Sequence, residues 1–171
     1  MSAPNGNAEV ASRFASIARQ FCAAVDSASS MDKIELLARI YPILPELIGE
    51  AIGLPDVALS EIATVHLNVS RKEQQEWGQL CNLLKEKLGD WDLYHQVFDP
   101  TEDSEAIFGT LADDIADIYR DLKKGLDLNE TPSTPPEDAI WEWRLLFYSH
   151  WGKHAMDALL TIHFRLQDTQ S

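Results

Sequence analysis

The residues best suited to chemistry are a series of aspartates between Thr110 and Leu126. Asp113, Asp117 and Asp121 recur every four residues, and Asp114 directly follows the first of them. On a helix this spacing places carboxylates one turn apart along one side, as a Mg²⁺ ion bridging to a diphosphate requires. The candidate metal ligands of this stretch are Asp113, Asp114 and Asp117.

The same aspartates have a second interpretation, as a solvated face. With an advance of about 100° per residue, they centre about 130° from the middle of the helix's apolar face, so they point largely to solvent. Arg120 and Lys124 follow Asp117 and Asp121 by three residues, a spacing that suits surface ion pairs. We take the solvated face as the first interpretation and metal or phosphate binding as the alternative.

A second candidate cluster lies in the last long segment of the chain. His150, His154 and Asp157 fall at positions i, i+4 and i+7, so two imidazoles and a carboxylate share one flank of a helix and form a candidate metal-binding set. Paired histidines at this spacing also form polar edges or hydrogen-bonded parts of a core. The metal interpretation gains weight if this cluster and the acidic helix face one cleft.

The same segment contains a cation in an apolar stripe. Arg144 lies between Ile140 and Trp151, where an unpaired guanidinium would be costly to bury. We therefore expect a buried ion pair between Arg144 and an acid of another helix, for example Asp114 or Asp117, with anion recognition as the alternative.

Three apolar residues of this segment fall outside the core stripe. They lie on a different flank of the helix, so they are hard to bury in the same core. If exposed, they mark a dimer or partner surface. These residues are Leu146, Leu160 and Phe164.

The pattern of apolar residues predicts the helices that must position these groups. A first amphipathic helix covers Val10 to Val25, and a second follows Ser30 and is broken by Pro42 and Pro45. A third begins at the capping box of Ser70 and Glu73 and ends at Gly89, which suits a left-handed closing residue.

Three elements follow the third helix. A short helical turn is expected at residues 91–98, and the acidic helix is capped by Thr110. The last helix opens with Thr134 as cap and Pro135 as first helical residue, and a bend or close crossing is expected at Gly152.

The chain is expected to be all-α, a single helical bundle of about five main helices with a long, mostly buried C-terminal helix. We expect one domain over residues 10–167, with disordered ends at 1–9 and 168–171. No stretch is apolar enough to predict a membrane span. Cys22 and Cys81 fall in apolar stripes and are expected to be buried hydrophobes of a cytoplasmic protein.

Charge narrows the classes of partner. The chain has 28 acidic and 14 basic residues and a formal net charge of −14. Such a surface repels phosphate backbones and anionic lipids, so neither nucleic acid nor a membrane is an expected partner.

Three blocks of sequence carry a family resemblance. They are DLYHQVFDP at Asp92–Pro100, TLADDIADIYRDLKKGL at Thr110–Leu126 and FYSHWGKHAMDALLTIH at Phe147–His163. Together they resemble a family of small bacterial proteins catalogued as a domain of unknown function. The resemblance implies an all-helical fold and supplies no activity, cofactor or catalytic residue.

Two functional hypotheses follow. The first is a non-enzymatic cytoplasmic helical bundle, an interaction or regulatory module that needs no cofactor and binds itself or another protein through its last helix. The alternative is a divalent-metal-dependent hydrolase of a phosphorylated small molecule or nucleotide. It would use Mg²⁺ or Mn²⁺ on the acidic helix from Asp113 to Asp121.

Overall fold

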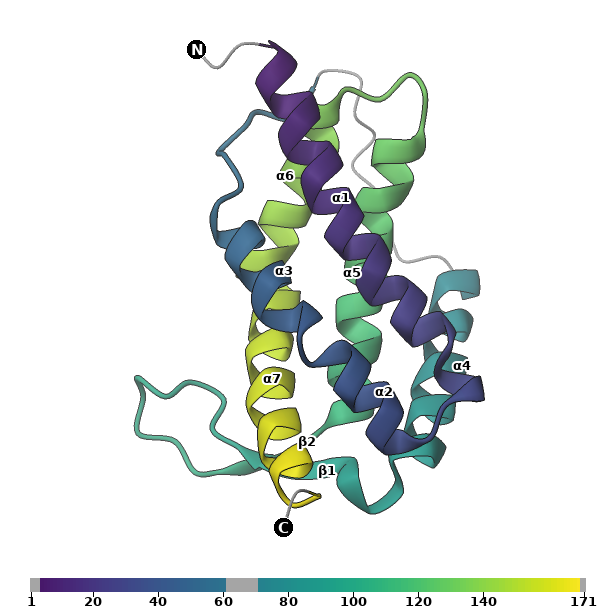
Figure 1. Cartoon of the computed structure of the whole chain (residues 1–171). Coiled ribbons are helices and arrows are strands. Elements are labelled where there is room, and N and C mark those ends of the chain that lie inside the picture. Colours follow the sequence, from purple (N-terminus) through teal and green to yellow (C-terminus); the bar gives the residue numbers. More distant parts are fainter. Residues whose placement is uncertain (1–3, 61–70, 170–171) are drawn as a thin grey trace.

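The computed structural model describes residues 4–60 and 71–169, most of them helical (Figure 1). The α-helices are α1 (Pro4–Asp26), α2 (Lys33–Ile40), α3 (Ile43–Ile52), α4 (Arg71–Leu88), α5 (Leu111–Glu130), α6 (Pro136–Leu146) and α7 (Gly152–Gln167). The other elements are the 3₁₀ turns η1 (Ala28–Ser30) and η2 (Gly89–Trp91), the π-helical segment η3 (Phe147–Trp151), and the strands β1 (Leu93–Gln96) and β2 (Ile107–Thr110). The predicted all-helical bundle with a long C-terminal helix is confirmed.

Helix α5 lies at the centre of the bundle and packs against α1, α4, α6 and α7 (Figure 1). Its apolar face meets aromatic side chains from two neighbours, Phe14 of α1 and Trp143 of α6, and all of these are buried. The C-terminal helix, expected to be long and mostly buried, packs against one side of α5. The aspartates of α5 therefore have helices on more than one side.

Several predicted helix boundaries are confirmed. Pro42 separates α2 from α3, Gly89 closes α4 with a φ of 55°, and the Thr110 side chain accepts a hydrogen bond from the Asp113 amide. The start of α6 differs by one residue, because Pro135 is the N-cap and Pro136 the first helical residue.

The ends of the chain differ in part from the prediction. Helix α1 begins at Pro4, so residues 4–9, expected to be disordered, belong to it. Residues 1–3 and 170–171, and the capping box that needs Ser70, lie outside the described residues. Among the described residues, no helix is both long and apolar enough to cross a bilayer.

A β-hairpin replaces the short helical turn expected at residues 91–98. Only Gly89–Trp91 is helical there, and β1 then pairs antiparallel with β2, with Leu93 opposite Thr110. The buried Asp92 accepts hydrogen bonds from the first two amides of α5, at its carbonyl from Leu111 and at its carboxylate from Ala112. These contacts join the hairpin to the start of the acidic helix.

The C-terminal helix runs from α6 through η3 to α7 without a break. Its middle is a π-helical turn, a wider turn often found at functional sites. A side chain at Gly152 would overlap the carbonyl oxygen of Phe147, so glycine permits the wide turn to close. The irregularity expected at Gly152 is thus a π-helical segment that ends beside it.

Candidate metal centre

Three of the four aspartates between Asp113 and Asp121 of α5 are buried. Asp114, Asp117 and Asp121 are covered, whereas Asp113 remains exposed. Helix α4 and the C-terminal helix pack against α5, and they supply Trp77 and two histidines that bond to these carboxylates. The predicted solvated face is therefore wrong for three residues, because an apolar stripe shows one contact face of a helix and not how many neighbours it has.

His154 of α7 is held by Asp114. Its Nδ1 atom lies 2.7 Å from Oδ1 of Asp114, and the Tyr94 hydroxyl donates to the other oxygen at 2.6 Å. Tyr94 reaches this carboxylate from β1 because its cross-strand neighbour is Gly109, where a side chain would overlap the tyrosine ring. The hairpin thus fixes the carboxylate that fixes His154.

His150 of η3 is held in the same way by Asp121. Its Nδ1 atom lies 2.6 Å from Oδ2 of Asp121. The other oxygen of Asp121 lies 3.4 Å from Nζ of Lys124 and 3.5 Å from Nε of Arg120. Each histidine therefore uses Nδ1 on a buried carboxylate, which leaves Nε2 for another partner.

Asp117 lies between the two histidines. Its Oδ2 atom is 3.5 Å from Nε2 of His154 and 3.8 Å from Nε2 of His150. Its other oxygen accepts hydrogen bonds from Arg120 at 2.7 Å and from Trp77 at 2.9 Å. The three residues offer ligand atoms that all lie within 4.8 Å of one another.

The distances from Asp117 to the two histidines are close to those between two ligand atoms of one metal ion. Atoms bound at about 2.0–2.2 Å to a tetrahedral ion lie about 3.4 Å apart. The Nε2 atoms of His150 and His154 approach this separation from Oδ2 of Asp117. Asp114 and Asp121 behind the rings complete two carboxylate–histidine pairs, the usual second shell of metal-bound histidines.

Burial and neighbouring charge shift the titration of this cluster. Burial raises the pKa of the Asp114 carboxyl above its usual value. Burial would also raise the pKa of Asp121, but its bond to His150 and the charges of Lys124 and Arg120 outweigh this effect and lower that pKa. The Asp121 carboxylate therefore stays ionised, and the groups around it donate hydrogen bonds to it.

The remaining predicted ligand, Asp157, lies outside this centre. It is half-buried and accepts from Lys153 one turn earlier on α7, and the group of ligand atoms that fits a metal contains Asp117, His150 and His154. The structure thus brings together one of the three candidate aspartates of α5 and both histidines as ligand atoms. Asp114 stands behind a histidine, and Asp113 points away.

The prediction of a buried ion pair for Arg144 is wrong. Its side chain keeps 35% of its surface exposed and pairs at 3.4 Å with Asp56, which is 85% exposed. The guanidinium also lies over the ring of Tyr148. It escapes burial because a long side chain can leave an apolar stripe at its edge and end in water.

The predicted interface residues divide into two groups. Leu146 is half-buried and packs against the core, whereas Leu160 and Phe164 of α7 are 60% and 59% exposed.

Sequence reasoning missed several partners of the cluster. Asp121 was part of the four-residue repeat, so its spacing could have identified it. Tyr94 lies in the first of the three family-like blocks, but no pattern connects it to Asp114. The sequence pattern does not predict the contact of Trp77 with Asp117, because the two residues lie on different helices that only the fold brings together.

The fold and the cluster define a class of protein, a helical bundle with a cluster of histidines and buried carboxylates between its central helix and its C-terminal helix. A family model described as "Domain of unknown function (DUF5063)" matches residues 5–168, so the chain belongs to that family, and the resemblance of the three blocks is confirmed. No curated protein matches the chain.

A solved structure shares the fold. The crystal structure of protein BF1032 from Bacteroides fragilis is similar with a TM-score of 0.71 and 23% identity, covering 88% of this chain and 87% of that chain. At this identity the similarity shows the helical architecture alone.

Proposed function

We propose that this protein binds one divalent transition-metal ion and uses it in hydrolysis. The ligand atoms are Oδ2 of Asp117 and Nε2 of His150 and His154. The observation that carries the proposal is that both histidines hold a buried carboxylate at Nδ1 and direct Nε2 toward the same oxygen.

The hydrogen-bonding roles of the rings support a cation between them. An ionised carboxylate only accepts, so each Nδ1 bonded to Asp114 or Asp121 carries a hydrogen, and a neutral ring then offers a lone pair at Nε2. Three electron-rich atoms face one another at 3.5 and 3.8 Å. A metal ion between these atoms would satisfy all three at once, and the experiment below separates metal binding from a purely hydrogen-bonded network.

The ligand set suits a zinc-type ion better than the Mg²⁺ or Mn²⁺ expected for an all-aspartate site. Two imidazoles and one carboxylate are typical of zinc and related ions, whereas Mg²⁺ prefers oxygen ligands. Three protein ligands leave a fourth position for water, and metal binding makes that water a nucleophile at neutral pH. His150 keeps 37% of its side chain exposed, so solvent reaches the centre.

Metal binding can be measured directly. Purified full-length protein, stripped with a chelator and titrated with Zn²⁺ or Co²⁺ in a calorimeter, should take up one equivalent. It should bind Mg²⁺ more weakly. The variants H150Q and D117N should lose stoichiometric binding, whereas H95Q, at an exposed histidine of β1, should bind like the wild type.

Two results would contradict the proposal, in whole or in part. If folded wild-type protein takes up no equivalent of zinc or cobalt, the cluster is a hydrogen-bonded network of histidines and carboxylates and the proposal is wrong. If the metal binds but no hydrolysis of a panel of phosphate, peptide and ester substrates follows, the hydrolase part fails and the metal-binding part remains.

A second candidate function is self-association through α7, and one observation favours it. Met156, Leu160 and Phe164 follow one another at four-residue steps, and each has half or more of its surface exposed. This forms an apolar strip along the helix that a second copy of the chain would cover. Light scattering should show a dimer for the wild type and a monomer for the L160D/F164D variant.

A further inference from the structure

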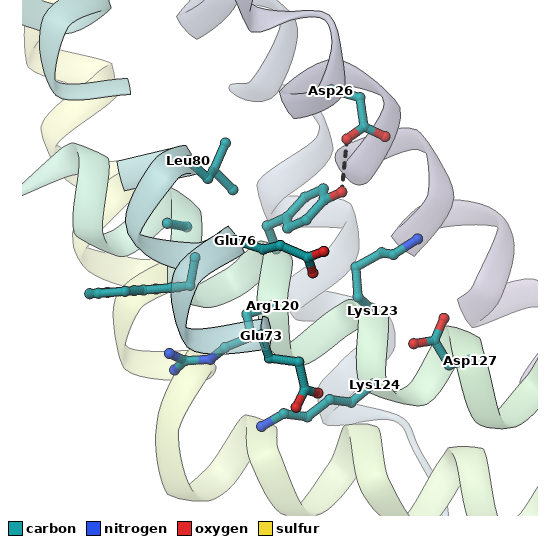
Figure 2. Close-up of a pocket in the computed structure, with 11 residues that line it drawn as sticks. Asp26, Glu73, Glu76, Leu80, Arg120, Lys123, Lys124 and Asp127 are labelled. Atoms are coloured by element: carbon teal, nitrogen blue, oxygen red, sulfur yellow. Dashed lines mark hydrogen bonds between the residues drawn. The ribbon is translucent and has the colours of Figure 1, made fainter. Parts of the chain in front are cut away.

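A pocket of about 440 Å³ lies between α4 and α5 (Figure 2), and some of its lining side chains bond to carboxylates of the metal centre. Its volume is within the range of small-molecule sites, about 300–1,000 Å³. The apolar part of its lining includes Trp77, Leu80 and Tyr119, and three cations of α5 also line it. The pocket therefore combines aromatic surface with positive charge.

Three side chains belong to both the pocket and the surroundings of the metal centre. Trp77 donates from Nε1 to Asp117 at 2.9 Å while its ring lines the pocket. Arg120 bonds to Asp117 at 2.7 Å, and Lys124 lies 3.4 Å from Asp121. A ligand in the pocket thus contacts side chains one hydrogen bond from the carboxylates of the metal centre.

The cations of the pocket have donors to offer. A guanidinium has five N–H groups, and Arg120 uses Nη2 on Asp117 and Nε on Asp121. Lys123 lines the pocket (Figure 2) and forms no ion pair within the part of the chain that the structure describes. These groups are suited to the oxygens of an anionic ligand.

Carboxylates also line the pocket, and their negative charge opposes the binding of an anion. There are four of them against three cations. Among them, Asp26 accepts from the Tyr119 hydroxyl at 2.8 Å and Glu76 lies 3.6 Å from Lys72. The side chains that line the pocket therefore carry one net negative charge, which disfavours a dianionic ligand unless a divalent metal ion is bound in the neighbouring centre. The inference below rests on the proposed function, because it needs that metal ion.

We infer that the pocket binds a phosphorylated small molecule with a planar body. The planar body lies against Trp77 and Tyr119, and the phosphate is bound by the cations of α5 that line the pocket, Arg120, Lys123 and Lys124. Base-like rings stack on aromatic side chains, and the guanidinium of Arg120, over the Trp77 ring at 5.6 Å, already contributes a cation–π contact there.

The test uses the metal-loaded full-length chain and three probes. Adenosine monophosphate carries both a planar ring and a phosphate, adenosine lacks the phosphate, and ribose 5-phosphate lacks the ring. Calorimetry should show the tightest binding for adenosine monophosphate, and weaker binding to metal-free protein. The K123Q variant should bind it about tenfold more weakly, from the loss of one charged contact. K85Q, at an exposed lysine of α4 outside the pocket, should match the wild type.

Zinc affinity, measured separately on each variant, distinguishes the two proposals. K123Q should bind zinc like the wild type, because Lys123 does not contact a ligand carboxylate. If the metal binds but adenosine monophosphate does not, or if K123Q binds it like the wild type, the pocket inference is overturned and the metal centre survives. If neither metal nor nucleotide binds, both are overturned.

Discussion

The Nδ1 atom of His150 lies 2.6 Å from Oδ2 of Asp121, although 29 positions separate the two residues in the chain. This contact joins the π-helical segment η3 to the acidic helix α5. It fixes the ring so that Nε2 turns toward Asp117. The position of one ligand atom thus depends on a carboxylate that would not itself touch the metal.

Replacing that carboxylate should weaken metal binding without abolishing it. In D121N the ring of His150 loses its charged partner, and loss of the carboxylate behind a metal-bound histidine typically costs about 10–100-fold in metal affinity. Zinc titration of the variant measures the loss. D113N is the matched control, because Asp113 is exposed on the same helix, and an equal loss in D113N would show a general charge effect.

The hydroxyl of Tyr94 should contribute to both stability and metal affinity. Y94F removes the hydrogen bond to Asp114 at 2.6 Å, which should lower the free energy of unfolding by about 1 kcal/mol. Urea unfolding with chelator measures this term, and zinc titration should show a loss smaller than that of D121N. Y148F changes an exposed tyrosine and should be neutral. Unchanged stability in Y94F would contradict a structural role for the hairpin contact.

The contact between α5 and α6 should be intolerant of a single methyl group at Gly125. A side chain there would overlap the indole of Trp143, whose nitrogen donates to the Leu122 carbonyl at 3.1 Å. G125A should therefore destabilise the fold by about 2–3 kcal/mol through overpacking. G78A is the control, because a side chain at Gly78 in α4 meets nothing within 4 Å, and it should stabilise by about 0.5–1 kcal/mol. Equal stability of the two variants would refute this packing.

His154 should keep its proton to unusually high pH in the metal-free protein. Burial would lower its pKa, but the hydrogen bond and charge of Asp114 outweigh burial and raise it above the ordinary value of 6.5. The charged groups on α5 that add to this effect are Asp117 and Asp113. His150 faces the same ring from η3 at a centroid separation of 4.8 Å.

The sign of the resulting pH dependence follows from linkage. Because the folded-state pKa of His154 is raised, its stabilisation is complete below about pH 6.5 and is lost as the pH rises through the folded pKa. With chelator present, the difference in unfolding free energy between wild type and H154Q should shrink over the pH interval that begins near the ordinary pKa of about 6.5 and extends above it. A difference that grows over this interval would contradict the prediction. Zinc affinity should rise over the same interval, because the metal displaces the proton.

Local signals predicted much of the fold. Pro42, the left-handed Gly89 and the cap at Thr110 act within a few residues, so their effects can be read from neighbours in the chain, whereas Pro45 lies inside α3 and does not break it. The hairpin was missed because each strand has only four residues. That length is too short for a period of two to stand out.

The amino-acid sequence by itself determined the helices, the acidic repeat on α5 and the four-residue spacing of His150 and His154, because these are properties of neighbouring residues on a regular helix. Only the tertiary structure decided that Asp114, Asp117 and Asp121 are buried and that the histidines meet them. The physical reason is that helix periodicity reveals a contact face but not the number of helices around it. Here α4 and α7 cover the side of α5 that periodicity assigned to water.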